Sequence, residues 1–362
     1  MILVDPAIWR WRGRRWAHLV SDTSHEELHA FAGHLGLRRI WFQGDHYDIP
    51  SDLREEALRL GAVAVESREL VVRITAAGLR KRRTRTPLSL GDAEPALAAL
   101  GPREPGLAVD LRPSYAPGMP AWTDLVTSDP SAAMEFYARL FGWEYDGADG
   151  YLLCRLRGHA VAGLSTSAVG PPTRPTWTTY LAEADVDAAA ERVVAAGGLV
   201  VLGPATAGAH GRLLVGSDPT GGRFGLWAAG SQHGAELIDE PGAPTWTELH
   251  TAEPSTAEAF YSAVCGHTFA EVDPRPGRSG YRTISVLGRP AAGVRIRPPG
   301  PGAPVTRWVP YMAVEDVDAT VTTALAAGGR LAEPPEDAPF GRWAALTDPQ
   351  GALVTIVEVG AR

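Results

Sequence analysis

The feature that most constrains this chain of 362 residues is an internal repeat. The stretch WTDLVTSDPSAAMEFYARLFGW begins at Trp122, and the closely similar stretch WTELHTAEPSTAEAFYSAVCGH begins at Trp246. Similar sequences bury similar faces, so a repeat of this length predicts two structural units that share one plan. The length also exceeds what one ordinary core supports, and two or three domains are expected.

Each copy opens with a strand that leads to an acid–proline pair, Asp129-Pro130 in the first copy and Glu253-Pro254 in the second. An acid suits the positive end of a helix dipole and proline suits the first helical turn, so a helix is expected to start there. Strand pairs that turn at glycine are expected after each helix. The predicted apolar helix faces and turns are Phe136, Tyr137, Leu140 and Gly158, matched by Phe260, Tyr261, Val264 and Gly288.

The second half of each copy repeats the same order of elements. WTTYLAEADVDAAAERVVAAGG and WVPYMAVEDVDATVTTALAAGG are typical of a strand, a helix and a glycine stop, and each precedes a hairpin around an Asp-Pro-x-Gly turn. The β-α-β-β-β plan is therefore expected four times. We predict an α+β protein with modules over residues 119–230 and 243–360, a Pro- and Gly-rich linker over 81–118, and a small α/β domain over 1–80.

These motifs resemble the vicinal-oxygen-chelate superfamily, which includes glyoxalase I, extradiol dioxygenases, fosfomycin-resistance enzymes and bleomycin-binding proteins. The resemblance rests on FY..LFGW in the first helix, DVDAA at the second helix start and DP.G at the final turn, and it covers roughly residues 119–359. It implies two modules that each curl their strands into a cup-shaped sheet around a ligand. Tandem forms of this kind also resemble actinobacterial proteins described as hydroxylases or antibiotic-tailoring proteins.

The resemblance also implies where a metal would be held. Metal-using members need His and carboxylate ligands at one place in each of four strands. Here those places carry aromatic, small, apolar or arginine side chains, and the permanent charge of arginine repels a metal ion. We therefore expect both cups to be free of metal. The eight residues are Trp122, Thr178, Arg212 and Gly225 in the first copy, and Trp246, Val309, Arg342 and Thr355 in the second.

The resemblance further implies which side chains line each cup. Side chains alternate across a strand, so Trp122 shares a face with Asp124, and Trp246 shares one with Glu248. Aromatic walls with one acid and one guanidinium suit a planar, partly anionic or polyphenolic ligand. Two alternatives stay open: the tryptophans belong to the core, and the arginines simply pair with the two acids. The predicted ligand-binding residues are Trp122, Trp246, Tyr180, Tyr311, Arg212 and Arg342.

The copies differ at one informative position, where the first has Val126 and the second has His250. A histidine two residues from an acid on the same face can act as a general base. If there is chemistry, we expect the second cup to carry it, whereas the first is structural or only binds. The candidate catalytic residues are His250, Glu248 and, in the first cup, Asp124. A histidine of the surface or core is the alternative interpretation.

The first 80 residues resemble a small uncharacterised family of unknown function, in ELHAFAGHLGL, WFQGDHYDIP and REEALRLGAV. A helix is predicted after a cap at Asp22 or Ser24. Its HEELH stretch matches the metalloprotease motif by chance, because so small a domain lacks the scaffold for a third ligand. Asp45, His46 and Asp48 crowd behind a turn, where they could bind a cation or perform acid–base chemistry. Capping of local amides is the alternative.

The composition limits the binding partners and the cellular location that we expect for this protein. Residues 1–90 contain 15 basic against 11 acidic residues, whereas the remainder contains 19 against 31, which argues against a phosphate-binding surface on the repeats. No apolar run reaches the roughly 18 residues of a membrane span. We expect a cytoplasmic monomer or homodimer that binds a small molecule and neither nucleic acid nor membrane. No dinucleotide fingerprint or phosphate loop occurs, so no cofactor is expected.

Together these features predict metal-independent binding of a small aromatic or polyketide-like metabolite by a secondary-metabolite tailoring enzyme. Isomerisation, cyclisation, elimination and cofactor-free oxygenation all fit cups with carboxylates, histidine and arginine. One alternative is a non-catalytic resistance protein that sequesters a drug or metabolite. A second alternative is a metal-dependent glyoxalase-like lyase or dioxygenase.

Overall fold

The computed structural model describes residues 1–11, 14–37, 42, 45–80, 115–148, 150–165, 175–271, 280–297, 306–338 and 340–359. They fall into two compact units, Met1–Arg112 and Pro113–Arg362, and each unit is described by itself. The predicted linker over 81–118 lies almost entirely outside the described residues. Among the described residues, no helix combines the length and apolar character that a bilayer crossing requires.

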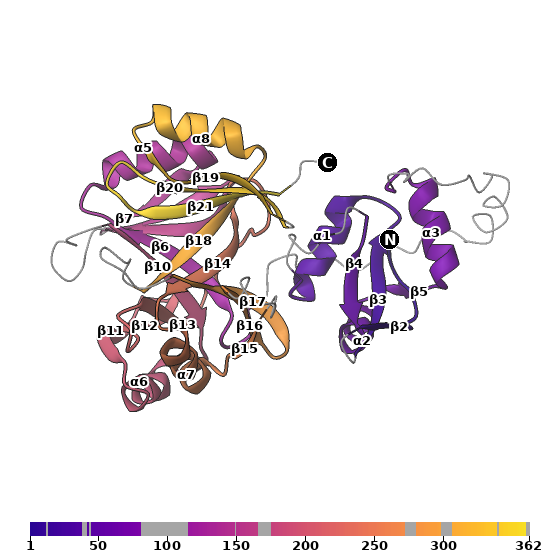
Figure 1. The fold of residues 1–362 in the computed structure, drawn as a ribbon, viewed down its shortest axis with the longest axis horizontal. Coiled ribbons are helices and arrows are strands. Elements are labelled where there is room, and N and C mark those ends of the chain that lie inside the picture. The colour runs from indigo at the N-terminus through magenta and orange to yellow at the C-terminus, as the bar shows by residue number, and fades with distance from the viewer. Residues whose placement is uncertain are drawn as a thin grey trace. The chain divides into compact units, whose positions relative to one another are not determined.

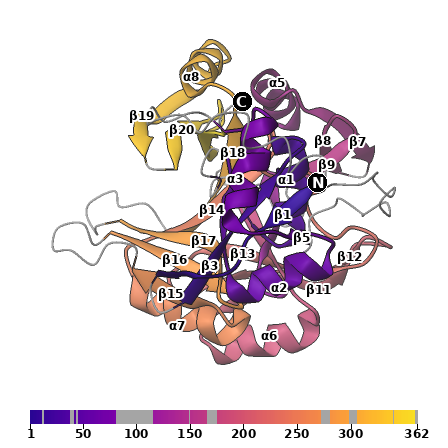
Figure 2. The ribbon, with the colours of Figure 1, turned by 90° about the vertical axis from the view of Figure 1, so that its right-hand side faces the viewer.

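In its described residues, the first unit contains a small mixed sheet with helices α1, α2 and α3 (Figures 1 and 2). Strand β3 pairs antiparallel with β1, β2 and β4, and β1 pairs parallel with β5. A small α/β domain was predicted here. The elements in chain order are β1 (Ile2–Val4), β2 (Trp9–Trp11), β3 (Arg14–Ser21), α1 (His25–His34), β4 (Tyr47–Pro50), α2 (Ser51–Arg59), β5 (Val63–Ala64) and α3 (Ser67–Ala76).

Helix α1 begins where its capping residue predicts. The Ser24 hydroxyl accepts a hydrogen bond from the Glu27 backbone N–H at 3.1 Å, which satisfies a donor that has no partner within the helix. Leu28, Ala32 and Leu35 are fully buried, as the periodicity predicts. Helix α3 was not predicted. The sequence RRIWFQ over residues 38–43 predicts a strand, but it lies outside the described residues except at Phe42, which is in no strand.

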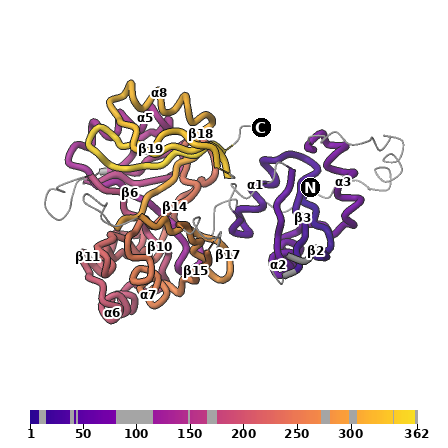
Figure 3. The backbone as a smooth tube through the Cα atoms, viewed as in Figure 1, coloured from indigo at the N-terminus to yellow at the C-terminus, as the bar shows by residue number. Residues whose placement is uncertain are grey.

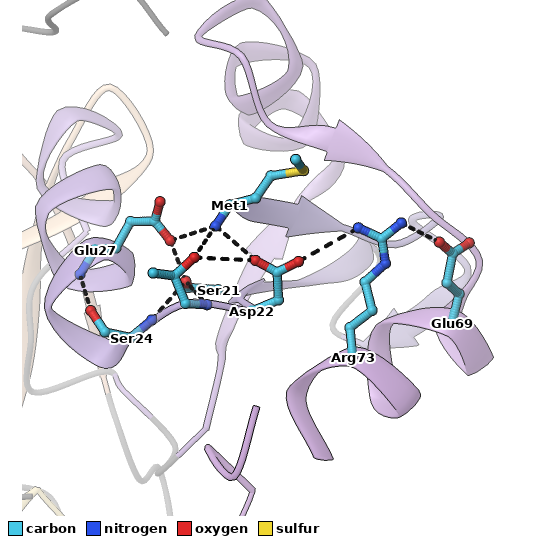
Figure 4. Close-up of polar contacts among 8 residues, drawn as sticks. Met1, Ser21, Asp22, Ser24, Glu27, Glu69 and Arg73 are labelled. Carbon is cyan, nitrogen blue, oxygen red and sulfur yellow. Dashed lines mark hydrogen bonds and ion pairs between the residues drawn. The ribbon is translucent and has the colours of Figure 1, made fainter. Parts of the chain in front are cut away.

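Polar contacts at the start of β1 and the end of β3 join this sheet to α1 and α3 (Figure 4). The Met1 ammonium lies 2.7 Å from a carboxylate oxygen of Asp22 and 2.7 Å from one of Glu27. The Arg73 guanidinium, which is 6% exposed, lies 3.6 Å from Asp22 and 2.6 Å from Glu69. Asp22 therefore connects two cations, the Met1 ammonium just before β1 and the Arg73 guanidinium on α3.

The second unit repeats one plan four times, as predicted, in a sheet of 16 strands. Each of the four repeats consists of a strand, a helix and three further strands. The elements are β6 (Pro120–Val126), α5 (Pro130–Phe141), β7 (Glu144–Ala148), β8 (Tyr151–Leu156), β9 (His159–Ser165); β10 (Thr176–Ala182), α6 (Val186–Ala195), β11 (Leu199–Thr206), β12 (Gly211–Ser217), β13 (Arg223–Ala229); β14 (Pro244–Thr251), α7 (Pro254–Cys265), β15 (Thr268–Glu271), β16 (Tyr281–Val286), β17 (Arg289–Ile296); and β18 (Arg307–Val314), α8 (Val317–Ala326), β19 (Arg330–Ala338), β20 (Gly341–Thr347), β21 (Leu353–Glu358).

The helices pair across the two copies and not within them. Helix α5 of the first copy lies beside α8 of the second, and α6 of the first lies beside α7 of the second (Figures 1 and 3). One buried core joins Phe136 on α5 to Val317 on α8, and another joins Val193 on α6 to Phe260 on α7. Each core is therefore built from half of each copy, so neither copy buries its helices alone.

Two reciprocal hydrogen bonds connect the helix motif of one copy to the final turn of the other. The Tyr137 hydroxyl of α5 donates to Asp348 at 3.1 Å, and the Tyr261 hydroxyl of α7 donates to Asp218 at 3.0 Å. The other carboxylate oxygen of Asp348 accepts three backbone N–H groups of its own turn. The FY motif of each copy is therefore joined to the DP.G motif of the other copy by a buried hydrogen bond.

Replacement of either tyrosine by phenylalanine tests this contact. Tyr137→Phe and Tyr261→Phe each leave a buried carboxylate oxygen without its donor, so we expect each to lower the free energy of unfolding by about 1–3 kcal/mol. Urea denaturation of the purified variants measures the change. Arg139→Ala, which removes an exposed ion pair with Glu135 on the same helix as Tyr137, serves as the control and should change stability by less than about 0.5 kcal/mol. Tyrosine variants as stable as this control would show that the contact contributes nothing.

Candidate functional site

Each copy presents one face of its strands away from the helices, and we call these faces the first and second cup. In the first cup, Asp124 on β6 lies opposite Thr178 on β10 and Gly163 on β9. In the second, Glu248 on β14 lies opposite Val309 on β18 and Gly293 on β17. The two carboxylates therefore occupy equivalent positions at the centre of their sheets.

An aromatic pair closes over each glycine. The Trp122 indole N–H donates to the Tyr151 hydroxyl at 2.8 Å, and the Trp246 indole N–H donates to the Tyr281 hydroxyl at 3.0 Å. A Cβ added to Gly163 would lie 2.1 Å from the Tyr151 hydroxyl oxygen, and the same holds for Gly293 and Tyr281. Glycine is needed there because the tyrosine ring lies directly on the backbone. The sequence analysis did not identify either tyrosine.

The first cup is largely apolar around its acid. Trp122 and Tyr180 join one hydrophobic cluster with Trp227, and Ala235 from the segment between the copies belongs to it. Asp124 is 4% exposed, and its Oδ1 atom has no hydrogen-bond partner among the described residues. Burial raises the pKa of Asp124 to about 7, although interaction with the Tyr180 hydroxyl and the charge of Arg223 oppose this shift. Such a site favours a protonated carboxyl.

The second cup has a polar centre. The Tyr311 hydroxyl donates to Glu248 Oε2 at 2.5 Å, and His250 Nε2 lies 3.2 Å from the same oxygen. His250 is 2% exposed, and its Nδ1 atom has no partner among the described residues. Burial lowers the pKa of His250, as do the charges of Arg297 and Arg295, against the opposing effect of Glu248. The imidazole is therefore neutral at neutral pH, with Nε2–H directed to the carboxylate.

Three arginines surround the histidine. Arg295 on β17 and Arg307 on β18 both lie opposite His250 in the sheet register. Arg295 and Arg297 form ion pairs with Glu333 on β19, and the Arg295 guanidinium lies 4.8 Å from the centre of the Trp343 ring. No carboxylate pairs with Arg307 in the part of the chain that the structure describes, and its Nε is buried without a partner. Positive charge exceeds negative charge here.

Two predicted ligand-binding residues lie on the opposite face. Arg212 forms an ion pair with Asp187 on α6, and Arg342 binds Asp318 on α8 through two hydrogen bonds of 2.9 and 3.0 Å. On β12 the cup face carries Val215, whereas Leu214 faces the helices, and the alternation places Arg212 with Leu214. The placement of both arginines in the cups was therefore wrong, as was their pairing with Asp124 and Glu248.

The described donor atoms of the cups do not fit the metal that many proteins of this fold hold. The first cup offers one carboxylate, and the second offers one carboxylate and one imidazole that already contact each other. Arginine side chains flank the second set and oppose a cation. Within the described ranges, three close ligand atoms are found only in the first unit, on His18, His46 and Asp48.

The structure brings together the predicted cluster of Asp45, His46 and Asp48 in the first unit. His46 lies 2.5 Å from Asp45 and 3.4 Å from Asp48. Burial opposes the charged form of His46, but the hydrogen bonds to both acids outweigh it and raise its pKa to about 9. His18 on β3 joins this group and was not predicted. His25 and His29 of the HEELH stretch contact the Leu79 carbonyl and the Tyr47 hydroxyl instead.

Comparison with known proteins agrees with this architecture. Residues 120–226 match the Glyoxalase/Bleomycin resistance protein/Dioxygenase superfamily, residues 233–357 match the Glyoxalase-like domain, and residues 2–77 match a family of unknown function, DUF4031. CFP32 of Mycobacterium tuberculosis, named as a candidate glyoxylase, is 42% identical over 256 residues, which are 68% of this chain and 97% of that protein. The chain belongs to the glyoxalase/bleomycin resistance/dioxygenase superfamily, as its motifs predicted.

Two further similarities bear on the tandem unit. The anthracycline biosynthesis protein DauV of Streptomyces sp. (strain C5) is 37% identical over 265 residues, covering 68% of this chain and 94% of that protein. Among solved structures, homoprotocatechuate 2,3-dioxygenase from Arthrobacter globiformis superposes with a TM-score of 0.50 at 14% identity, covering 68% of this chain and 81% of that one. At that identity the superposition shows a shared fold.

The elevated pKa of Asp124 predicts a pH dependence of stability. The folded protein retains the proton up to about pH 7, whereas the unfolded chain loses it near 3.8. Between these values the folded state binds more protons, so this group makes stability fall as pH rises. Asp124→Asn removes the titration, and its stability relative to wild type should increase from pH 5 to pH 7 by up to ~1.4 kcal/mol per pH unit.

Urea denaturation of both proteins at several pH values measures this difference. Asp146→Asn, at an exposed acid on β7 at the end of the same sheet, provides the control and should run parallel to wild type over the same range. A pH-independent difference between wild type and Asp124→Asn would mean that the carboxyl is ionised throughout.

Proposed function

We propose that the second cup binds a planar, partly anionic metabolite of the aromatic or polyketide type and that the protein acts on it as a tailoring enzyme. The observation that carries the proposal is the contact of Glu248 with His250 and Tyr311, surrounded by arginines. The similarity to an anthracycline biosynthesis protein favours the same ligand class. The first cup, in this proposal, has a structural or purely binding role.

The charge balance supports an anionic ligand. Arg295 and Arg297 share one carboxylate, that of Glu333, and Arg307 has no acidic partner in the described part of the chain. A partly buried guanidinium without a counter-charge is unfavourable in the free protein. A ligand carboxylate or phenolate would supply that counter-charge, and the rings of Trp246 and Trp343 would stack on the ligand plane.

The arrangement around His250 suits proton transfer. Because Nε2–H is directed to Glu248, the Nδ1 atom carries the free lone pair, as in catalytic histidines that a carboxylate orients. Burial keeps the imidazole neutral, which is the form that accepts a proton. His250 would take a proton from an acidic C–H or O–H group of the ligand, and the arginines would stabilise the resulting anion. Returning the proton to another atom of the same ligand would complete an isomerisation.

No step in this proposal requires a metal. We propose metal-independent chemistry because the cup donors form one acid–imidazole contact and face arginines. Stabilisation of an enolate or phenolate, which a metal ion supplies in other members of the superfamily, would come from guanidinium groups.

A matched pair of variants tests the role of His250. An anthracyclinone, a tetracyclic quinone polyketide, serves as the probe, with tryptophan fluorescence for binding and mass spectrometry with chromatography for product. We expect His250→Ala to lower turnover by at least ~100-fold and to change the Kd by only a few-fold, because the proton acceptor is lost but the walls remain. Val126→Ala, at the equivalent position of the first cup, should leave both unchanged.

The outcomes separate the enzyme from its alternative. Equal turnover in His250→Ala and wild type would exclude this residue from the mechanism. Tight one-to-one binding, with the probe recovered unaltered from wild type, would instead indicate a protein that sequesters its ligand.

Arg307 provides a test of the anionic ligand. Arg307→Gln should weaken binding of the probe by ~10- to 100-fold, because a charge-assisted hydrogen bond is lost. The same variant should be at least as stable as wild type to heat, because an uncompensated charge has been removed. Arg282→Gln is the matched control: Arg282 pairs with Glu258 on the helix side of β16, so its loss should not affect binding. Unaltered binding by Arg307→Gln would show that the guanidinium does not contact the ligand.

A further inference from the structure

Three side chains of the first unit direct ligand atoms toward one point. His18 on β3 lies opposite Asp48 on the neighbouring β4, and His46 lies two residues before Asp48. Asp48 Oδ1 is 3.7 Å from His18 Nε2 and 3.4 Å from His46 Nε2, and all three ligand atoms lie within 4.8 Å of one another. Strand β3, strand β4 and the residue just before β4 therefore position two imidazoles and one carboxylate together.

We propose that His18, His46 and Asp48 bind a first-row divalent transition-metal ion of the Zn²⁺ type. The ligand atoms would be Nε2 of each histidine and Oδ1 of the aspartate. This site is separate from the cups and belongs to the unit whose family has no assigned function.

The second nitrogen of each imidazole supports this assignment. His18 Nδ1 lies 2.8 Å from Asp5 Oδ2, and His46 Nδ1 lies 2.5 Å from Asp45 Oδ1. A carboxylate on Nδ1 keeps the proton on that nitrogen, so a metal ion would bind at Nε2, where it would take the place of a proton on His46. Metal-binding histidines commonly have such an acidic partner, and here both have one. A single histidine–aspartate pair on a surface would not place two imidazoles, each with a carboxylate at Nδ1, beside a third carboxylate.

The spacing also fits an ion. Four ligands placed tetrahedrally at Zn–N and Zn–O bond lengths lie ~3.3 Å apart. The separations of 3.4 and 3.7 Å from Asp48 are close to that value, so small side-chain adjustments would complete three coordination positions. These adjustments require no change in the strands, because the β3–β4 register already sets His18 against Asp48.

Asp5 is held rigidly for its orienting role. Its side chain is 1% exposed, and it accepts hydrogen bonds from the His18 backbone N–H at 2.6 Å and the Ser67 hydroxyl at 2.7 Å. Both bonds favour the charged form that a histidine partner needs. These hydrogen bonds offset the cost of burying the carboxylate and fix its position beside the His18 imidazole.

Charge and access agree with a cation. Three carboxylates, of Asp5, Asp45 and Asp48, surround the two imidazoles, and one guanidinium, that of Arg80, pairs with Asp45 at 3.4 Å. The ligand side chains are partly exposed, at 30% for His18, 23% for His46 and 38% for Asp48, so an ion can reach them. Three protein ligands leave at least one position for water or a further ligand, as in catalytic zinc sites.

The donor set selects the class of ion. Two imidazole nitrogens with one carboxylate suit zinc, iron, cobalt or nickel, whereas calcium and magnesium prefer all-oxygen sets. The experiment therefore uses Zn²⁺ for affinity and Co²⁺ as a spectroscopic substitute. The full-length protein, stripped with a chelator, is titrated with Zn²⁺ by calorimetry and with Co²⁺ by visible absorption.

Wild type should bind one Zn²⁺ per chain with a Kd of about 10 μM or tighter, and Co²⁺ should give d–d bands of a low-symmetry nitrogen–oxygen site. His46→Ala and Asp48→Asn should each weaken binding by at least ~100-fold, because one of three ligands is lost. His34→Ala on α1, whose imidazole contacts the Ala30 carbonyl, is the matched histidine control and should bind as wild type does. His250→Ala should also bind Zn²⁺ as tightly as wild type, and this result would exclude the second cup as the binding site.

The orienting acids give a second measurement. Asp45→Asn should weaken Zn²⁺ binding by ~10- to 100-fold without changing the stoichiometry, because the imidazole is no longer fixed and polarised. Circular dichroism checks that each variant is folded. The proposal is wrong if the folded wild type shows no saturable binding below about 100 μM Zn²⁺, or if His46→Ala and Asp48→Asn bind as tightly as wild type.

Discussion

The tandem unit depends on the exchange of contacts between its two copies. Tyr137 reaches from the first helix of one copy to Asp348 in the last turn of the other, and Tyr261 makes the reverse contact with Asp218. Both contacts lie at the edge of a core that half of each copy builds. A single copy would expose an apolar helix face and leave a buried acid without its donor, both of which are unfavourable. Each copy therefore needs a second copy to bury its helices, which explains why the FY and DP.G motifs occur in both.

One face of the sheet packs against the helices and the other lines the cups, so the side chains of the two cups can differ. Side chains alternate along each strand, so a substitution on the cup face leaves the helix-side core unchanged. At equivalent positions the first cup has Val126, Ser165 and Thr176 where the second has His250, Arg295 and Arg307. The first cup consequently packs as an apolar cluster around one buried acid with a raised pKa, whereas the second concentrates charge. One shared scaffold thus holds two chemically different surfaces, and the difference resides in a few side chains.

The sequence predicted the elements well because each carries local signals. The repeat, the Asp-Pro helix starts and the glycine turns predicted four βαβββ units, and alternation predicted that Trp122 and Asp124 share a face. The face on which Arg212 and Arg342 lie could not be predicted from the sequence. A change of one residue in the strand register moves their side chains from the cup side to the helix side. Tyr151 and Tyr281 were missed because only the close approach of each ring to Gly163 or Gly293 shows their role. In the first unit, Asp45, His46 and Asp48 are neighbours in sequence, whereas His18 joins them only through the pairing of β3 with β4. Sequence proximity identified part of that cluster, and strand register completed it.

The two candidate sites differ in the sign of the charge that they lack. In the second cup, guanidinium groups outnumber the carboxylates that pair with them, so the free site is short of negative charge. In the first unit, three carboxylates surround two imidazoles and Arg80 pairs with only one of those carboxylates, so the site with neutral imidazoles is short of positive charge. Buried or half-buried charge imbalance is costly to a folded chain, and a bound partner of opposite sign is the general way to offset it. The same argument therefore leads to an organic anion at one site and a metal cation at the other. It also explains why a metal in the second cup is disfavoured: the arginines that would attract an anionic metabolite repel a divalent ion from the same space.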